Sequence, residues 1–295
     1  MPPDTRSGLA ALARPSGAFA MVALDQRESL RTMLGGEMIP DQALTAFKID
    51  AARALTPHAS AVLLDMAFGL GPVLEAGVLV EDCGLIVAAD RLVQPPGGIV
   101  EDTAVDDSVF ADSEVTARAD AFKLLVIWRP GRDHARRAAT VRAFLDACRQ
   151  RGRPGIVEGI VRPDPGTHLT PERHAELVVE AAVELTEAGP DLYKAEVPSL
   201  GLADDQSTTA AAARLTEAIA PPWVVLSNGV RPERFDDAAV AAARGGASGF
   251  LAGRAIWLES IAAEDPRTHL ETVAAARLAA LAERIDGVAR PWSAA

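Results

Sequence analysis

Short apolar runs alternate with longer amphipathic stretches along most of this chain. The apolar runs have the length and composition of strands, and eight of them predict strands at 18–25, 60–65, 84–90, 121–128, 155–161, 191–197, 222–227 and 247–252. Helical periodicity between them predicts helices at 41–55, 134–151, 171–188, 204–220 and 232–244. At Thr170-Pro171 a capping residue precedes a proline in the first helical position, which is a typical helix start. Eight alternating strand and helix units predict an α/β fold, a parallel sheet closed into a (β/α)8 TIM barrel.

The remaining segments fit one domain that covers residues 1–295, a length suited to a single barrel. Residues 1–17 predict an irregular lead-in with one short helical turn. Residues 266–295 predict a helical tail that caps the barrel or contacts another subunit. Residues 91–120 predict a long loop rich in Pro, Gly and Asp before a short helix, and loops of that length usually have a function, for example as a lid.

Composition and charge narrow the classes of partner. Apolar residues make up 49% and aromatic residues 4% of the chain, and the formal charge is -12. This charge argues against nucleic acids and anionic membranes, but not against a small anion held by local cations. Cys83 and Cys148 are expected to be buried free thiols. No apolar run approaches a membrane span or a signal core, so we expect a soluble, cytoplasmic protein. The five histidines are dispersed, and we predict no metal site.

The segment Asp191–Pro198 places a lysine inside the sixth predicted strand. Side chains alternate along a strand, so Leu192, Lys194 and Glu196 share one face. If that face points into the barrel, burial disfavours the ammonium form of Lys194 and makes the free amine available for imine formation with a carbonyl group. The alternative is a lysine at the strand edge that reaches solvent.

Two further charged residues interrupt strands, Lys123 in the fourth and Glu158 in the fifth. A barrel interior usually holds Val, Ile and Leu, so charges there are costly unless they pair or function. A structural ion pair between Lys123 and Glu158 is one interpretation. With Lys194 added, the set suits a nucleophilic amine (Lys194), a proton carrier (Glu158) and a cation that holds a substrate oxygen (Lys123), and we favour this functional interpretation.

The last two strands lead into glycine-containing turns, Ser227-Asn228-Gly229 and Gly249–Arg254. In barrels these two loops frequently form a phosphate site from backbone N–H groups. A hydroxyl group and a guanidinium group would complete it. The predicted binding residues here are Ser227, Gly229, Leu251, Gly253 and Arg254. Ordinary tight turns with an exposed arginine are the alternative.

The first predicted strand ends in Asp25-Gln26-Arg27-Glu28, which places charged groups over the mouth of the barrel. We predict that Asp25, Gln26 and Arg27 contact substrate, although a helix cap with surface charges is the commoner use of such residues. Arg129 and Arg162 also follow strands and are further candidates for binding an anionic group. Exposed positions at the rim are the alternative for these two arginines.

Taken together, these segments resemble class I aldolases of the tagatose-bisphosphate and sulfofructosephosphate type. The resemblance runs from about Phe19 to Trp257. It is carried by Ala23–Glu28, Phe122–Leu125, Val157-Glu158, Leu192–Pro198, Val225–Ser227 and Gly249–Ala255, and it is closest to the sulfofructosephosphate aldolases. It implies that Lys194 forms the imine, that Glu158 accepts a proton, that Asp25 and Lys123 hold substrate hydroxyls, and that Ser227 and Arg254 bind phosphate. No cofactor is implied, and a homo-oligomer is expected. Two departures are the less polar segment Asp65–Phe68, and Asn228 in place of a smaller residue.

The leading hypothesis is cleavage of 6-deoxy-6-sulfofructose 1-phosphate to dihydroxyacetone phosphate and sulfolactaldehyde. The alternatives are a tagatose 1,6-bisphosphate aldolase and a non-catalytic barrel that binds phosphosugars. A sulfonate carries one negative charge, whereas a phosphate monoester carries nearly two. Among Gln26, Arg27, Arg129 and Arg162 we expect one net cation to face the distal group, which favours the sulfonate.

Overall fold

In the computed structural model, which describes residues 8–95, 98–164 and 166–295, eight parallel strands form a closed barrel. They are β1 (Phe19–Leu24), β2 (Ala61–Leu64), β3 (Gly84–Ala88), β6 (Ala121–Trp128), β7 (Gly155–Val161), β8 (Leu192–Glu196), β9 (Trp223–Leu226) and β10 (Gly249–Ala252). Around the barrel they follow the order β1-β10-β9-β8-β7-β6-β3-β2. Each strand lies within a range predicted from the apolar pattern, so the TIM-barrel prediction is confirmed.

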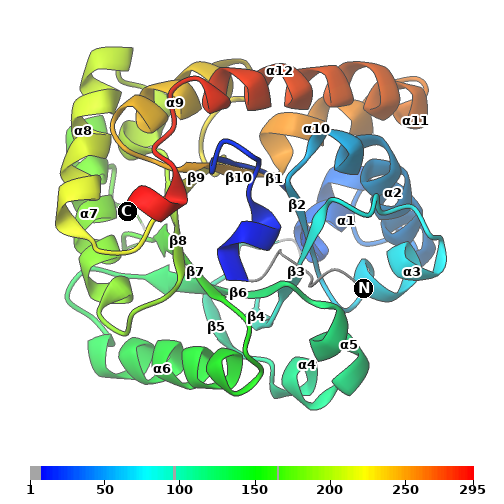
Figure 1. Ribbon diagram of the computed structural model, residues 1–295, viewed down its shortest axis with the longest axis horizontal. Coiled ribbons are helices and arrows are strands. Elements are labelled where there is room, and N and C mark those ends of the chain that lie inside the picture. Colours follow the sequence, from blue (N-terminus) through cyan, green and yellow to red (C-terminus); the bar gives the residue numbers. More distant parts are fainter. Residues whose placement is uncertain (1–7, 96–97, 165) are drawn as a thin grey trace.

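The helices surround the barrel as an outer ring (Figure 1). The five predicted helices are α2 (Asp41–Leu55), α6 (His134–Gln150), α7 (Pro171–Thr186), α8 (Asp205–Ala218) and α9 (Pro232–Arg244). Thr170 caps α7, because its hydroxyl accepts a hydrogen bond from the Arg173 N–H at 3.2 Å. Shorter helical segments lie between or after the strands: α1 (Glu28–Leu34), η2 (Thr56–His58), α3 (Leu70–Glu75), η3 (Pro198–Gly201) and α10 (Arg254–Ile261), the last of which follows β10. No helix of the described residues is both long and apolar enough to cross a membrane.

The apolar side chains of the strands divide among three clusters: one under the helices, one inside the barrel, and a small one of Ile127, Ile160 and Leu226 that lines the cavity at the C-terminal end. On β8, Leu192 belongs to the inner cluster. Tyr193, Ala195 and Val197 belong to the outer cluster. Alternation along the strand therefore directs Lys194 into the barrel, as the sequence predicts.

The N-terminal end of the barrel is closed by the chain itself. The short helix η1 (Gly8–Leu12) lies across the centre of the barrel in the view of Figure 1. Its Leu9 and Leu12 join the inner apolar cluster. The fit is tight, because a Cβ atom added to Gly84 would lie 2.6 Å from the carbonyl oxygen of Ala11. Within the lead-in predicted at 1–17, η1 is the helical turn that the structure describes, and residues 1–7 lie outside the described ranges.

The C-terminal tail completes the helical ring. It is helical through α11 (Pro266–His269), the π-helical turn η4 (Leu270–Ala274) and α12 (Ala275–Asp286), which contact α2, α9 and β1. The final turn η5 (Trp292–Ala294) then returns to the closed end of the barrel, where the Trp292 N–H donates to the Gly17 carbonyl oxygen at 3.0 Å. The predicted tail thus packs against its own barrel and joins the two ends of the described chain.

The prediction of a long loop at 91–120 is wrong in part. This segment forms an antiparallel hairpin of β4 (Asp90–Val93) and β5 (Asp102–Val105), followed by α4 (Asp107–Ala111) and α5 (Ser113–Arg118). These two strands have four residues each and mix polar with apolar side chains, so they form no apolar run like those of the equally short barrel strands β2, β9 and β10. Asp106 and Asp112 cap the two helices with their carboxylates. The hairpin is the element that places additional side chains beside the C-terminal end of the barrel.

Candidate active site

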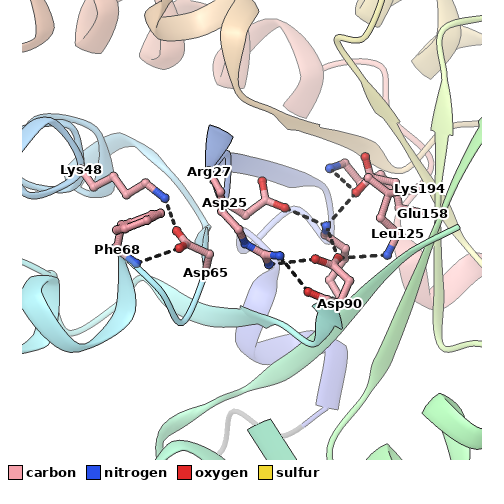
Figure 2. Close-up of polar contacts among 10 residues, drawn as sticks. Asp25, Arg27, Lys48, Asp65, Phe68, Asp90, Leu125, Glu158 and Lys194 are labelled. Carbon is pink, nitrogen blue, oxygen red and sulfur yellow. Dashed lines mark hydrogen bonds and ion pairs between the residues drawn. The ribbon is translucent and has the colours of Figure 1, made fainter. Parts of the chain in front are cut away.

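A cluster of buried charges fills the C-terminal end of the barrel, with Lys123 at its centre. The Nζ of this lysine lies 2.7 Å from Asp25 Oδ2, 2.8 Å from Asp90 Oδ2 and 3.2 Å from Glu158 Oε2. Only 1% of Lys123 is exposed. Burial alone would lower the pKa of Lys123, but the three carboxylates raise it well above its usual range. Lys123 is therefore a permanent cation that holds these carboxylates together. Figure 2 labels the three acids, Asp25, Asp90 and Glu158.

Lys194 lies beside this cluster and shares Glu158 with Lys123. Glu158 and Lys194 are paired residues on the neighbouring strands β7 and β8, and Lys194 Nζ lies 3.0 Å from Glu158 Oε2. Both ammonium groups are within ion-pair distance of Oε2, but neither meets it in hydrogen-bond geometry, so this buried oxygen keeps an acceptor position free. Lys194 has one carboxylate partner where Lys123 has three. The carboxylates of the cluster therefore surround Lys123 more closely than they surround Lys194.

Asp25 and Asp90 complete the anionic side of the cluster. Burial would raise the pKa of Asp25, but Lys123 and Lys194 hold it well below its usual range. Asp90 accepts hydrogen bonds from Arg27 at 2.9 Å and from the Leu125 N–H at 3.1 Å, and its carbonyl oxygen accepts a second bond from Arg27 at 2.8 Å. Burial disfavours the Arg27 cation, yet Asp90 raises its pKa overall. The charge of Arg27 is therefore matched by Asp90 and not left for a ligand.

A cavity of about 200 Å³ opens above the cluster. Ten of the residues predicted from the sequence line it: Asp25, Gln26, Arg27, Glu158, Arg162, Lys194, Ser227, Leu251, Gly253 and Arg254. Three predicted residues are not among the lining residues. Lys123 lies beneath the cavity within its carboxylates, Gly229 lies off the wall, and Arg129 instead donates to the Glu101 carbonyl oxygen at 3.0 Å. The structure thus brings most of the predicted site together and sets Arg129 outside it.

Sequence reasoning missed several lining or supporting groups. The hairpin contributes Leu92, Gln94, Gly98, Ile99 and Val100 to the wall, and the ends of the barrel strands contribute Leu125, Ile127, Ile160 and Leu226. Asp90 was visible as an acid at a strand end, but its contact with Lys123 was not. Asn228 also lines the cavity, and the only signal for it was its position beside Ser227. Within the described ranges, no three His, Cys, Asp or Glu residues are grouped so that they could hold a metal ion.

Two arginines supply positive charge at the cavity without an ion pair to any carboxylate of the described residues. Arg254 donates from NH2 to the amide oxygen of Asn228 at 2.8 Å, and burial lowers its pKa. Burial also lowers the pKa of Arg162, whose Nε is buried with no hydrogen-bond partner. The side-chain oxygen of Gln26 is likewise buried and unpartnered. The wall therefore offers unused donors and an unused acceptor to a polar, anionic ligand.

The less polar segment that begins at Asp65 does not reach the cavity. The Asp65 carboxylate pairs with the buried ammonium group of Lys48 and accepts a hydrogen bond from the Phe68 N–H at 2.9 Å. Figure 2 shows this pair on the side of Arg27 that faces away from Lys194. The Phe68 ring lies 6.0 Å from Lys48 Nζ. Asp65 thus serves a separate structural ion pair.

Comparison with solved structures agrees with the fold. The fructose-bisphosphate aldolase of Plasmodium falciparum superposes with a TM-score of 0.70 over 95% of this chain and 93% of that one, at 16% identity. An archaeal fructose 1,6-bisphosphate aldolase gives a TM-score of 0.59 over 95% and 98%, at 15% identity. The architecture is that of the aldolase barrels.

Comparison with family models gives the class of enzyme. The chain belongs to the DeoC/LacD family of class I aldolases, because the model described as DeoC/LacD family aldolase matches residues 19–259. It is therefore a carbon–carbon lyase. Tagatose 1,6-diphosphate aldolase of Listeria monocytogenes is 30% identical over 322 residues, covering 97% of this chain and 92% of that protein. Tagatose 1,6-diphosphate aldolase 1 of Enterococcus faecalis is 27% identical over 281 residues, covering 87% and 85%.

Proposed function

We propose that the protein cleaves 6-deoxy-6-sulfofructose 1-phosphate to dihydroxyacetone phosphate and sulfolactaldehyde through an imine on Lys194. The observation that carries the imine chemistry is the pair of Lys194 and Glu158, 3.0 Å apart, both lining the same cavity. A buried amine beside a carboxylate with a free acceptor position has both groups that a retro-aldol reaction needs.

The reaction follows from these groups. The neutral amine of Lys194 attacks the ketone carbon C2, and loss of water gives an iminium ion. Glu158 takes the proton of the C4 hydroxyl as the C3–C4 bond breaks, and the bonding electrons move into the iminium group to form an enamine. The aldehyde leaves, the enamine is protonated at C3, and hydrolysis releases dihydroxyacetone phosphate and the amine. Lys123 keeps Asp25 ionised and lies 3.2 Å from Glu158 Oε2, and Asp25, which lines the cavity, accepts a hydrogen bond from a substrate hydroxyl.

Charge balance supports a sulfonate at the distal end. Ser227, Gly253 and Arg254 form one side of the cavity and suit the phosphate on C1. Of the other predicted cations, Arg27 is matched by Asp90 and Arg129 lies outside the lining residues. Arg162 remains as the one additional cation, with a free Nε donor. One uncompensated charge suits a sulfonate better than a phosphate monoester with nearly two.

The imine is tested by sodium borohydride reduction in the presence of dihydroxyacetone phosphate, followed by intact mass and peptide mapping. The chain has three lysines, at positions 48, 123 and 194, and all three are buried, so exposed lysine side chains give no background. We expect one adduct per chain, located on Lys194, and none in Lys194→Arg. An adduct on Lys48 or Lys123, or no adduct at all, would reject Lys194 as the nucleophile and favour a barrel that only binds phosphosugars.

The substrate is tested by comparing kcat/KM for 6-deoxy-6-sulfofructose 1-phosphate with the values for tagatose and fructose 1,6-bisphosphates. We expect the sulfosugar to be preferred by about tenfold or more, which corresponds to roughly 1.4 kcal/mol of transition-state discrimination. Tagatose 1,6-bisphosphate is the second candidate, because relatives that align over most of the chain are tagatose 1,6-diphosphate aldolases. A preference of that size for a bisphosphate would reject the sulfosugar and leave the aldolase chemistry intact.

A further inference from the structure

Arg254 depends on a neutral side chain for its position. It begins α10, directly after β10, and most of its side chain is buried. Its NH2 group donates to the Asn228 Oδ1 atom at 2.8 Å, and no carboxylate of the described residues forms an ion pair with it. The contact orients the guanidinium group without cancelling its charge, because an amide oxygen carries no net charge.

Asn228 is itself held from below by a buried acid. Its Nδ2 atom donates to Glu196 Oε1 at 2.7 Å. The other oxygen of Glu196 accepts from the Val161 N–H at 2.8 Å. An amide that donates to a carboxylate with its nitrogen and accepts from a guanidinium with its oxygen satisfies both neighbours in a single orientation. An aspartate or an alanine at position 228 cannot make both contacts.

The chain of contacts from Glu196 through Asn228 to Arg254 crosses three neighbouring strands. Glu196 ends β8, Asn228 follows the end of β9, and Arg254 follows the end of β10. Glu196 lies two residues beyond Lys194 on the same face of β8, so the anion-binding arginine is linked to the strand that bears the reactive amine. The negative charge of Glu196 also acts on Arg162, where it opposes the lowering of the pKa by burial. One buried carboxylate is thus placed to influence both free guanidinium groups of the cavity.

We propose that Glu196 and Asn228 are positioning residues that direct the Arg254 guanidinium group into the cavity and leave its charge available to the phosphate group of the substrate. This inference rests on the proposed function for the identity of the anion. It assigns to Asn228 and Glu196 a role in binding phosphate without contact with the reacting atoms. Replacing Asn228 by aspartate would place a carboxylate against Arg254, so the substitution closest in shape should impair phosphate binding more than truncation does.

The test compares Asn228→Asp and Asn228→Ala with the unchanged protein at about pH 8, where an introduced carboxyl group is ionised. The measured quantity is the ligand concentration that gives half-maximal borohydride trapping on Lys194. Dihydroxyacetone phosphate is one ligand, and dihydroxyacetone, which lacks the phosphate, is the control. Thermal unfolding of each variant is measured alongside. Trapping on Lys194 in the unchanged protein tests the imine separately from this inference.

We expect the half-saturating concentration of dihydroxyacetone phosphate to rise by about tenfold or more in Asn228→Asp, and by a smaller factor in Asn228→Ala. The value for dihydroxyacetone should change by less than about threefold in both, because it does not use the phosphate contact. A loss of structure alone would raise the half-saturating concentrations of both ligands by the same factor. It would not make dihydroxyacetone phosphate bind more weakly to Asn228→Asp than to Asn228→Ala. Unchanged binding of dihydroxyacetone phosphate, an equal shift for both ligands, or a larger effect of alanine than of aspartate would overturn the proposal. If the aspartate variant does not fold, the alanine variant decides by the same comparison of the two ligands.

Discussion

At the scale of single residues, this chain uses lysine only where the side chain is buried. Its three lysines are Lys48, Lys123 and Lys194, and every other basic side chain apart from histidine is an arginine. An ammonium group is compact and loses its charge more readily than a guanidinium group when buried. A lysine, unlike an arginine, can therefore supply the amine that the imine proposed on Lys194 requires, whereas Lys123 is kept charged by three carboxylates.

The third lysine allows a test of a buried ion pair outside the active site. In Lys48→Met the carboxylate of Asp65 loses its partner in an apolar environment, and we expect the free energy of unfolding to fall by about 3–5 kcal/mol. Adding Asp65→Asn removes the stranded charge, and the amide oxygen still accepts from the Phe68 N–H, so the double variant should regain much of the loss. Urea denaturation measures both. A double variant no more stable than Lys48→Met would show that the stranded charge is not the cause.

The ionisation of Asp25 makes the stability of the protein depend on pH. Its pKa in the folded state lies below its ordinary value of 3.8, so its stabilising effect is fully present above about pH 5 and declines as the pH falls below about 4. As the pH is lowered from about 6 to about 3, we expect the difference in unfolding free energy between the unchanged protein and Asp25→Asn to shrink. Urea titrations at several pH values measure it. A difference that stayed constant with pH would contradict the lowered pKa.

At the scale of elements, the contact between β7 and β8 places the proposed base beside the proposed nucleophile. The register pairs Glu158 with Lys194 and Gly159 with Ala195. On the outer face, Tyr193 covers Gly159, and a Cβ atom added there would lie 2.1 Å from the tyrosine hydroxyl oxygen. The absence of a side chain at position 159 therefore leaves room for the Tyr193 hydroxyl beside the strand, next to Glu158.

Gly159→Ala should reduce stability by about 1–3 kcal/mol, because the added methyl group overlaps the Tyr193 hydroxyl in a packed core. Tyr193→Phe in the same chain should restore part of it, since the next ring atom is 3.1 Å from the added Cβ. Thermal unfolding measures the stability of each variant. Borohydride trapping tests whether Lys194 can still form the proposed imine. Tyr193→Phe alone is the control, and failure of the double variant to recover would place the strain elsewhere.

At the scale of the whole molecule, the two ends of the barrel have separate tasks. The C-terminal end holds the charge cluster and the cavity. The N-terminal end is closed by η1 and fastened by the tail, where Asp286 accepts from Arg14 at 2.7 Å and from the Ser16 hydroxyl at 2.6 Å. Changes at the closed end should therefore alter stability without altering the chemistry.

Asp286→Ala tests this separation, since it removes two charge-assisted hydrogen bonds that join the ends of the chain. We expect a loss of about 1–3 kcal/mol of unfolding free energy with kcat/KM unchanged. Asp237→Ala is the matched control. Asp237, on α9, forms an ion pair with Arg284, which lies on α12 like Asp286. This pair is exposed and should contribute less than about 1 kcal/mol. A fall in kcat/KM for Asp286→Ala, measured well below the unfolding temperature, would show that the two ends are coupled.

The sequence by itself determined the barrel and indicated the groups to which the proposed chemistry is assigned. Each barrel strand is an apolar run in the sequence, and the period of two along β8 places Leu192, Lys194 and Glu196 on one face, so these features are encoded locally. Ten of the residues that line the cavity were predicted for a related reason, since they lie in or just beyond the barrel strands and parallel strands end on one edge.

Only the tertiary structure decided how these groups are paired. Asp90 contacts Lys123, Asn228 joins Glu196 to Arg254, and Arg129 donates to the β4–β5 hairpin. The residues next to them in the sequence do not indicate any of these contacts. Such contacts depend on the stagger between strands and on the course of the β4–β5 hairpin. These are set by the closure of the whole sheet, and a local pattern of hydrophobic and polar residues contains no information about them.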